Sequence, residues 1–257
     1  MNLTRLLYLN APTGLRHAVA LVLPEPVKAR VRHRVGPTRF SQPEGPVTAS
    51  WDNADISLYL DPDYQHKPHV RRSQELVLEY LRQTVLRSAG AVSLLDAACG
   101  NGRLYRALEE ADFLRSVDYR GLDMSPKLVE AARRISPGGA FELGSIEAMP
   151  YAAESFDVVV TQHVLRYLES YEAAVRELLR VSRRVVILVE KEAADEDRLG
   201  TYYNETLGSF FPLNLYDPAK LKAFARANGA SLAFTLNDSR VDDPDGQAVY
   251  VFYKPAP

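Results

Sequence analysis

Two strand ends in the first half of the chain carry the residue types that hold a nucleoside. An apolar run ends in Asp96 and leads into a loop with Gly100 and Gly102, and the next run ends in Asp123, 21 residues after Gly102. Glycines let a ligand approach the backbone because no Cβ stands in the way. A strand-end carboxylate can accept hydrogen bonds from both hydroxyls of a ribose. A glycine loop alone is equally consistent with a structural turn, but loop and spaced acid together indicate a nucleoside site.

A dinucleotide is one alternative ligand for this loop. A pyrophosphate site uses the pattern Gly-x-Gly-x-x-Gly, with backbone amides free to meet phosphate. Here Gly102 is followed by Arg103, Leu104 and Tyr105, so the third glycine is missing. The loop therefore fits a ligand without phosphate better than a dinucleotide.

The elements that must position these residues alternate along the chain. Short apolar runs predict strands at 92–97, 119–123, 141–143, 156–161, 184–190, 231–236 and 248–254. Helical spacing predicts a helix from about residue 68 to the stop at Gly90, and others at 104–111, 126–135, 171–181 and 218–228. This alternation implies a parallel sheet with helices on both faces, and the last two strands, with no helix between them, indicate an antiparallel edge or insertion. In such sheets ligands bind at the carboxyl ends of the strands.

Four sequence segments carry a resemblance to a known family. They are residues 95–102 (LDAACGNG), 121–125 (GLDMS), 144–151 (GSIEAMPY) and 155–159 (SFDVV). Together they resemble the class I S-adenosylmethionine-dependent methyltransferases, over roughly residues 70–192. The resemblance implies an α/β fold with a Rossmann-like, seven-stranded, mostly parallel sheet, an antiparallel C-terminal strand and an N-terminal cap. It also implies S-adenosyl-L-methionine as the cofactor.

The same resemblance assigns cofactor-binding roles to particular residues. The methionine part is held by the loop with Asp96, Ala98, Gly100 and Gly102, and the ribose by Asp123 and Met124. The adenine is held by Ser145, Ile146 and Glu147, and the methionine and the reacting methyl are faced by Gln162 and His163. Two positions depart from the family pattern. Ala98 stands where the family has its first loop glycine, and alanine fits there if the backbone keeps φ below zero. Ser145 replaces a frequent acid, and an ionised acceptor bonds more strongly than a hydroxyl.

Methyl transfer from a sulfonium ion is an in-line displacement whose leaving group is a neutral thioether. Catalysis therefore requires alignment of the nucleophile and removal of its proton where it has one. We expect His163, just past the fourth strand, to act as general base, with Tyr167 as its orienter. The alternative is that His163 packs against the cofactor.

We expect two segments outside the sheet to cover the acceptor. Residues 1–66 form an arm or cap before the methyltransferase domain at 67–257, and residues 193–216 form an insertion in that domain. The candidate acceptor contacts are Tyr59, Tyr64, His66 and His69 in the first segment and its junction, and Tyr202 and Tyr203 in the insertion. The insertion's aromatic residues either stack on the acceptor or bury a helical hairpin. We expect no metal site, since a proline interrupts the carboxylates and imidazoles of residues 61–69 and favours a solvated loop.

Composition limits which cellular compartment and which binding partners are expected. The 257 residues include one cysteine and carry a net charge of −2, which favours a reducing compartment and gives no overall field for nucleic acid. No apolar run reaches the ~18 residues of a membrane span. Residues 1–40 hold seven basic side chains against one acidic. The basic stretch 28–39 suits an anionic membrane surface, a phosphorylated acceptor, RNA or simple solvation.

These observations predict a cytoplasmic methyltransferase acting on oxygen or nitrogen of a small molecule, such as a sugar, a lipid-linked saccharide or a secondary metabolite. A non-catalytic S-adenosylmethionine-binding sensor or scaffold is one alternative. An RNA methyltransferase that uses the basic arm is another. The sequence leaves the acceptor and the oligomeric state undetermined.

Overall fold

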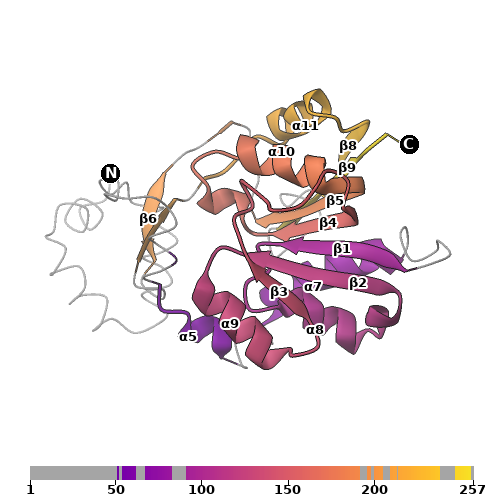
Figure 1. Ribbon diagram of the computed structural model, residues 1–257. Coiled ribbons are helices and arrows are strands. Elements are labelled where there is room, and N and C mark those ends of the chain that lie inside the picture. Colours follow the sequence, from indigo (N-terminus) through magenta and orange to yellow (C-terminus); the bar gives the residue numbers. More distant parts are fainter. Residues whose placement is uncertain are drawn as a thin grey trace, which may run out of the picture.

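A mixed sheet of seven strands forms the centre of the molecule (Figure 1). The computed structural model describes residues 51, 54–61, 67–82, 91–191, 196–197, 200–204, 209–212, 214–237 and 247–255. The strand order is β3-β2-β1-β4-β5-β9-β8. The strands are β1 (Val92–Ala97), β2 (Val117–Asp123), β3 (Ala140–Leu143), β4 (Phe156–Gln162), β5 (Ser182–Lys191), β8 (Leu232–Asn237) and β9 (Gln247–Tyr253). The first five are parallel to one another, as the sequence predicts.

The last two strands do not simply extend the sheet in chain order. β9 is antiparallel to both β5 and β8 and lies between them, so β8 forms the edge. The pairing of Ile187 with Val251 places β9 at the centre of this half of the sheet. The predicted antiparallel C-terminal strand is confirmed, and it takes the form of an insertion rather than an added edge.

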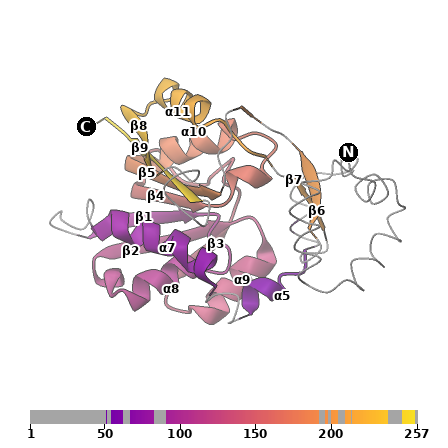
Figure 2. The same cartoon turned by 180° about the vertical axis from the view of Figure 1, so that it is seen from behind.

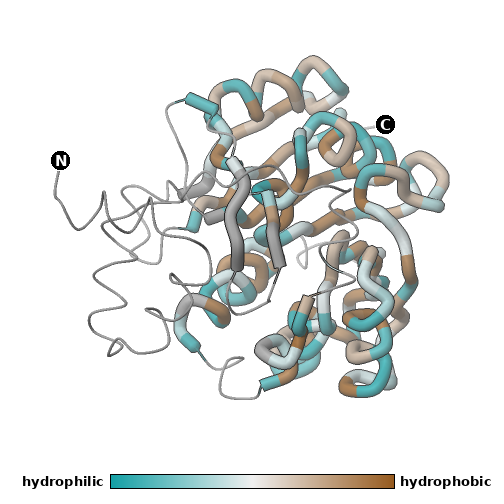
Figure 3. The backbone as a smooth tube through the Cα atoms, turned by 90° about the vertical axis from the view of Figure 1, so that its left-hand side faces the viewer, coloured by the Kyte–Doolittle hydropathy of each residue, from teal (hydrophilic) through white to brown (hydrophobic). Residues whose placement is uncertain are grey.

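Helices cover both faces of the sheet (Figures 1 and 2). They are α5 (Ser57–Leu60), α7 (Pro68–Tyr80), α8 (Arg103–Glu110), α9 (Pro126–Ile135), α10 (Glu172–Val181) and α11 (Pro218–Ala227), with the short 3-10 helices η2 (Phe113–Arg115) and η3 (Leu165–Tyr167). Two apolar clusters lie on opposite faces: Leu178 and Leu221 pack into one, and Val77 and Leu104 into the other. In Figure 3 these helices alternate between hydrophilic and hydrophobic colours, as expected for helices with one face on a sheet.

Two helix starts confirm predictions from local sequence. The Ser125 hydroxyl accepts a hydrogen bond from the Leu128 amide at 3.4 Å and caps α9. The Asp217 carboxylate accepts one from the Ala219 amide at 2.7 Å and caps α11. Proline follows each cap at the first helical position, where its missing N–H leaves no donor unpaired. None of the described helices is both long and apolar enough to cross a membrane.

A separate β-hairpin lies within residues 193–216, the segment predicted to be an insertion. Strands β6 (Thr201–Asn204) and β7 (Ser209–Pro212) pair antiparallel, with Tyr202 opposite Phe211. Figures 1 and 2 show the hairpin standing apart from the main sheet. The alternative of a helical hairpin was therefore wrong for this part of the insertion.

Candidate functional site

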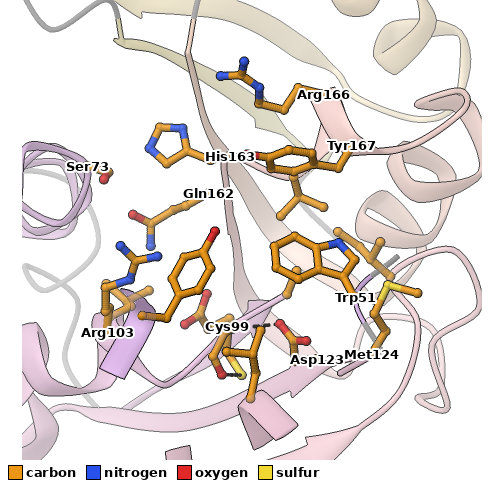
Figure 4. Close-up of a pocket in the computed structure, with 18 of the residues that line it drawn as sticks. Trp51, Ser73, Cys99, Arg103, Asp123, Met124, Gln162, His163, Arg166 and Tyr167 are labelled. Carbon is orange, nitrogen blue, oxygen red and sulfur yellow. Dashed lines mark hydrogen bonds between the residues drawn. The ribbon is translucent and has the colours of Figure 1, made fainter. Parts of the chain in front are cut away.

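A cavity of about 260 Å³ opens where β1, β2 and β4 end (Figure 4). The predicted residues that line it are Tyr59, Asp96, Ala98, Gly100, Asp123, Met124, Ile146, Gln162, His163 and Tyr167. The structure therefore brings most of the predicted cofactor residues and the two predicted catalytic residues into one cavity, whereas Gly102, Ser145 and Glu147 do not line it.

The two glycines of the loop after β1 have different roles. Both have left-handed backbones, with φ of +56° at Gly100 and +79° at Gly102. A Cβ on Gly100 would meet nothing within 4 Å, so the loop presents open backbone to the cavity there. A Cβ on Gly102 would lie 2.9 Å from the Phe141 ring. Gly102 is not among the cavity-lining residues, and its small size serves the packing of α8 against the sheet.

Ala98 corrects one expectation. Its φ is +65°, not negative, although it carries a Cβ. A left-handed backbone costs an alanine about 1–2 kcal/mol. The loop is held by the next residue, since the Cys99 amide donates to the Leu122 carbonyl at 2.9 Å. Strain of this kind persists where surrounding contacts fix the backbone, and it concentrates at functional sites.

Asp123 connects the glycine loop to the end of β2. Its carboxylate accepts from the Gly100 amide at 2.8 Å and from the Ser125 amide at 2.9 Å, one bond to each oxygen. Burial raises the pKa of Asp123, and these bonds oppose the rise. Each carboxylate oxygen has about two acceptor sites, so both oxygens can still accept from a diol in the cavity.

Asp96 lies deeper at the same end of the cavity. Its carboxylate accepts a hydrogen bond from the Tyr119 hydroxyl at 2.8 Å. Burial raises the pKa of Asp96 to about 7, against the lowering effect of this hydrogen bond. The carboxyl group is therefore able to change protonation state near neutral pH.

The predicted adenine turn presents one side chain to the cavity. Ile146 is buried and lines it, whereas Ser145 and Glu147 are not among the lining residues. The Ser145 hydroxyl accepts from the Glu147 amide at 3.1 Å and so stabilises the turn itself. Glu147 is exposed.

A buried carboxylate shapes the opposite end of the cavity. One oxygen of Glu190, near the end of β5, accepts from the Val164 and Leu165 amides, each at 3.0 Å. Burial raises the pKa of Glu190 to about 7. These two bonds hold the turn that carries His163 and Tyr167. Glu190 was not predicted, although it ends an apolar run of residues just as Asp96 and Asp123 do.

His163 has a left-handed backbone at the start of this turn, with φ of +58°. Its amide donates to the Val189 carbonyl at 2.7 Å, which fixes the turn against β5. Figure 4 shows the imidazole between Gln162 and Arg166, with the Tyr167 ring beside it. The Gln162 side chain is itself held, because the Gln74 amide donates to it at 3.2 Å.

Aromatic rings from three distant segments close this end. Trp51 packs on Phe211 of β7 at a centroid distance of 4.9 Å, on Tyr167 at 5.7 Å and on Tyr59 of α5 at 6.1 Å. The Tyr59 carbonyl accepts from the Asn101 side chain, which ties α5 to the glycine loop. Trp51, Tyr59 and Tyr167 line the cavity, and Trp51 was not predicted.

Two arginines in the cavity wall were also missed. The Arg103 guanidinium lies 5.4 Å from the centroid of the Tyr59 ring, and the Arg166 guanidinium lies 5.6 Å from that of Tyr167. Arg103 directly follows the glycine loop, and Arg166 directly precedes a predicted residue, so position along the chain was an available signal.

Several predicted contacts fall outside the described residues. Tyr64 and His66 do, and so do the basic stretch 28–39 and most of the 61–69 cluster. His69 lies in α7 and Tyr202 and Tyr203 lie in β6, but the described part of the chain does not include their side chains.

Comparisons with known proteins agree with this geometry. Residues 95–189 match the family model described as "Methyltransferase domain". The chain is 29% identical over 175 residues to malonyl-[acyl-carrier protein] O-methyltransferase of Erwinia pyrifoliae, covering 67% of this chain and 62% of that protein. It is 31% identical over 105 residues to demethylmenaquinone methyltransferase of Renibacterium salmoninarum, covering 40% and 43%. The chain thus spans less than two thirds of the length of either relative.

The fold also matches a solved structure with a ligand. Magnesium protoporphyrin IX methyltransferase from Synechocystis, solved with bound S-adenosylmethionine, superposes with a TM-score of 0.59 at 14% identity. The superposition covers 84% of this chain and all of the other. At that identity the likeness concerns the fold, and it agrees with the predicted Rossmann-like sheet.

Proposed function

From the match of residues 95–189 to the methyltransferase-domain family, we propose that the chain is a class I S-adenosylmethionine-dependent methyltransferase and that it methylates an oxygen or nitrogen atom of a small-molecule acceptor. The observation that carries the proposal is the hydrogen bond from Gly100 to Asp123 at one end of a cavity whose other end holds His163. The proposed cofactor site and a candidate base thus share one cavity.

The residues at the first end fit the cofactor. Gly100 presents backbone without a Cβ, Asp123 keeps acceptor capacity for the ribose hydroxyls, and Ile146 offers an apolar surface for the adenine. When bound, S-adenosylmethionine supplies an electrophilic methyl group on a sulfonium centre. Arg103, beside the loop, can pair with a carboxylate.

The residues at the other end fit the acceptor. His163 would remove the proton of the nucleophile, and Tyr167 would keep the acceptor and the imidazole in place. Glu190 is a positioning residue for both, because it binds the amides of the turn that carries them. Trp51 and Tyr59 line the cavity, and their rings offer apolar surface against which a small acceptor could pack.

Thermal unfolding with S-adenosylmethionine and with S-adenosylhomocysteine tests the cofactor assignment. Ligand at about 100 times its Kd adds ~2.7 kcal/mol of stability. For a chain of this size we expect the midpoint to rise by about 5–10 °C. Absence of a shift with both compounds would contradict the proposal.

A turnover assay then distinguishes the proposed enzyme from the alternative functions. Incubation with S-adenosylmethionine carrying a labelled methyl group and a panel of small-molecule acceptors should release labelled product. A thermal shift without turnover on any acceptor would support the sensor or scaffold alternative. Salt-sensitive RNA binding that is lost when residues 1–40 are deleted would support the RNA alternative.

A further inference from the structure

Arg166 is a cation in the cavity wall that forms no ion pair with a carboxylate of the described residues. Its backbone carbonyl accepts from the Asn214 amide at 2.8 Å, and its guanidinium lies over the Tyr167 ring. The Arg166 Nε atom is buried, and within the described residues no hydrogen-bond acceptor reaches it. Buried donors are nearly always paired in native structures. An unpaired buried donor beside a cavity therefore points to a ligand.

The carboxylates around the cavity do not satisfy this cation. Glu190 acts on Arg166 electrostatically, but the oxygen that the structure places in hydrogen bonds accepts from the turn amides. No ion pair within 4.0 Å joins Arg166 to a carboxylate in the parts of the chain that the structure describes. Figure 4 places Asp123 at the opposite end of the view, beyond Trp51.

The two acids that line the cavity, Asp96 and Asp123, lie away from Arg166. Asp123 lies at the end assigned to the cofactor, whereas Arg166 lies with His163 and Tyr167 at the end assigned to the acceptor (Figure 4). Asp96, on the strand that pairs with that of Asp123, also lines the cavity. A guanidinium is a planar donor that matches the two oxygens of a carboxylate or phosphate. Beside it, the Trp51 and Tyr167 rings offer apolar faces.

We propose that Arg166 binds an anionic oxygen group, carboxylate or phosphate, on the acceptor, whose planar or apolar body lies against Trp51 and Tyr167. This rests on the proposed function, because it takes the far end of the cavity as the acceptor site. Arg166 is then a specificity-determining residue that selects acidic acceptors over neutral ones and fixes their orientation toward His163.

Trp51 provides a direct readout of binding. It is the chain's single tryptophan and lines the same cavity, so its fluorescence should report occupancy. The probes are phenylacetate and phenyl phosphate, with uncharged phenylacetamide as their counterpart, in the presence of saturating S-adenosylhomocysteine. A charge-assisted hydrogen bond should favour at least one anionic probe over the amide by about tenfold or more. The two anions distinguish a carboxylate site from a phosphate site.

Three variants test whether Arg166 is the source of the preference for anions. Arg166→Gln should abolish the preference for anions, and Arg166→Lys should retain part of it. Arg176→Gln is the matched control, because the exposed Arg176 also covers an aromatic ring, Phe224, at 5.4 Å but lies outside the cavity wall. It should bind the probes as the parent chain does.

Two results would overturn the inference. One is that the parent chain shows no anion-dependent change in Trp51 fluorescence with millimolar probe. The other is that Arg166→Gln keeps the preference. The thermal shift with S-adenosylhomocysteine is measured on the same samples. A shift without anion preference contradicts this inference alone, whereas absence of the shift contradicts the proposed function itself.

Discussion

The two ends of the cavity are built in different ways. The end with Asp123 comes from β1, β2 and the loop between β1 and α8, segments that follow one another within 30 residues or so of chain and pair in register. The end with His163 joins residue 51, α5, the turn after β4 and strand β7. One end is thus made by local sequence, and the other by contacts between distant segments.

This difference has consequences for what each end can tolerate. At the Asp123 end, backbone amides and glycines form the contacts that shape the site, so few residues there can be replaced without loss of the site. At the His163 end, side chains from separate segments form the wall, so its shape and charge can vary while the sheet stays the same. Specificity should therefore reside at the second end, in residues such as Arg166 and Trp51.

Replacement of His163 should have the largest effect and should act on turnover alone. A general base contributes about 100-fold to 10,000-fold to the rate. We therefore expect His163→Asn to lower kcat by about 100-fold or more. Asparagine tolerates the positive φ at this position better than most residues. Cofactor affinity, measured by calorimetry, should stay within about twofold, and full activity in this variant would leave His163 a packing residue.

The buried carboxylate behind the turn should make stability depend on pH. The pKa of Glu190 is about 7 in the folded chain against 4.5 for an ordinary glutamate. Between these values the folded state binds more protons, so the free energy of unfolding falls as pH rises. Glu190→Gln keeps an oxygen for the two amides and removes the titration. It should reduce the fall between pH 5 and pH 8 by about 2–3 kcal/mol.

Denaturant unfolding at both pH values measures this difference. The exposed Glu130 supplies the matched control, since Glu130→Gln should leave the fall unchanged. The same fall in the parent chain and in Glu190→Gln would mean that the carboxylate titrates normally in the folded protein.

At the other end, a change at Asp123 should act on cofactor affinity. Asp123→Asn retains one acceptor oxygen for the loop but loses the ionised acceptor for a diol. We expect binding of S-adenosylhomocysteine to weaken by about 1–3 kcal/mol. Calorimetric titration measures it, with circular dichroism to confirm that the variant is folded. Unchanged affinity would remove the ribose assignment.

Ser145→Ala should have the smallest effect. Its hydroxyl bonds the Glu147 amide within the turn rather than pointing to the cavity. Substitutions of this kind usually change stability by less than about 0.5 kcal/mol. Cofactor affinity should change by less than about threefold, and a tenfold loss would show that this hydroxyl contacts the cofactor directly.

The contrast between the two ends also explains how far sequence reasoning reached. The sheet, the caps at Ser125 and Asp217 and the loop with Asp123 depend on near neighbours in the chain, and their patterns were visible. The positive φ of Ala98 could not be predicted from local sequence. The hydrogen bond from the next residue, Cys99, to Leu122 fixes the loop and imposes this backbone conformation against alanine's own preference.

The acceptor end was less predictable because its contacts cross the chain. Trp51 and Phe211 are 160 residues apart, and no local sequence pattern predicts that their rings are in contact. Two signals were nevertheless present. Glu190 ends an apolar strand, and the paired aromatics of 201–204 and 209–212 flank a short segment with Gly208, which is a hairpin pattern.

The position of β9 has a consequence for how the protein is made. During synthesis β5 emerges well before residues 247–253, yet β9 is the strand that pairs with it on that side. Until then the run Val185–Val189, apolar on both faces, has an open edge that invites pairing with another chain. Completion of the sheet must therefore wait for the late-emerging strand, and chains interrupted between β5 and β9 should aggregate rather than fold as shorter domains.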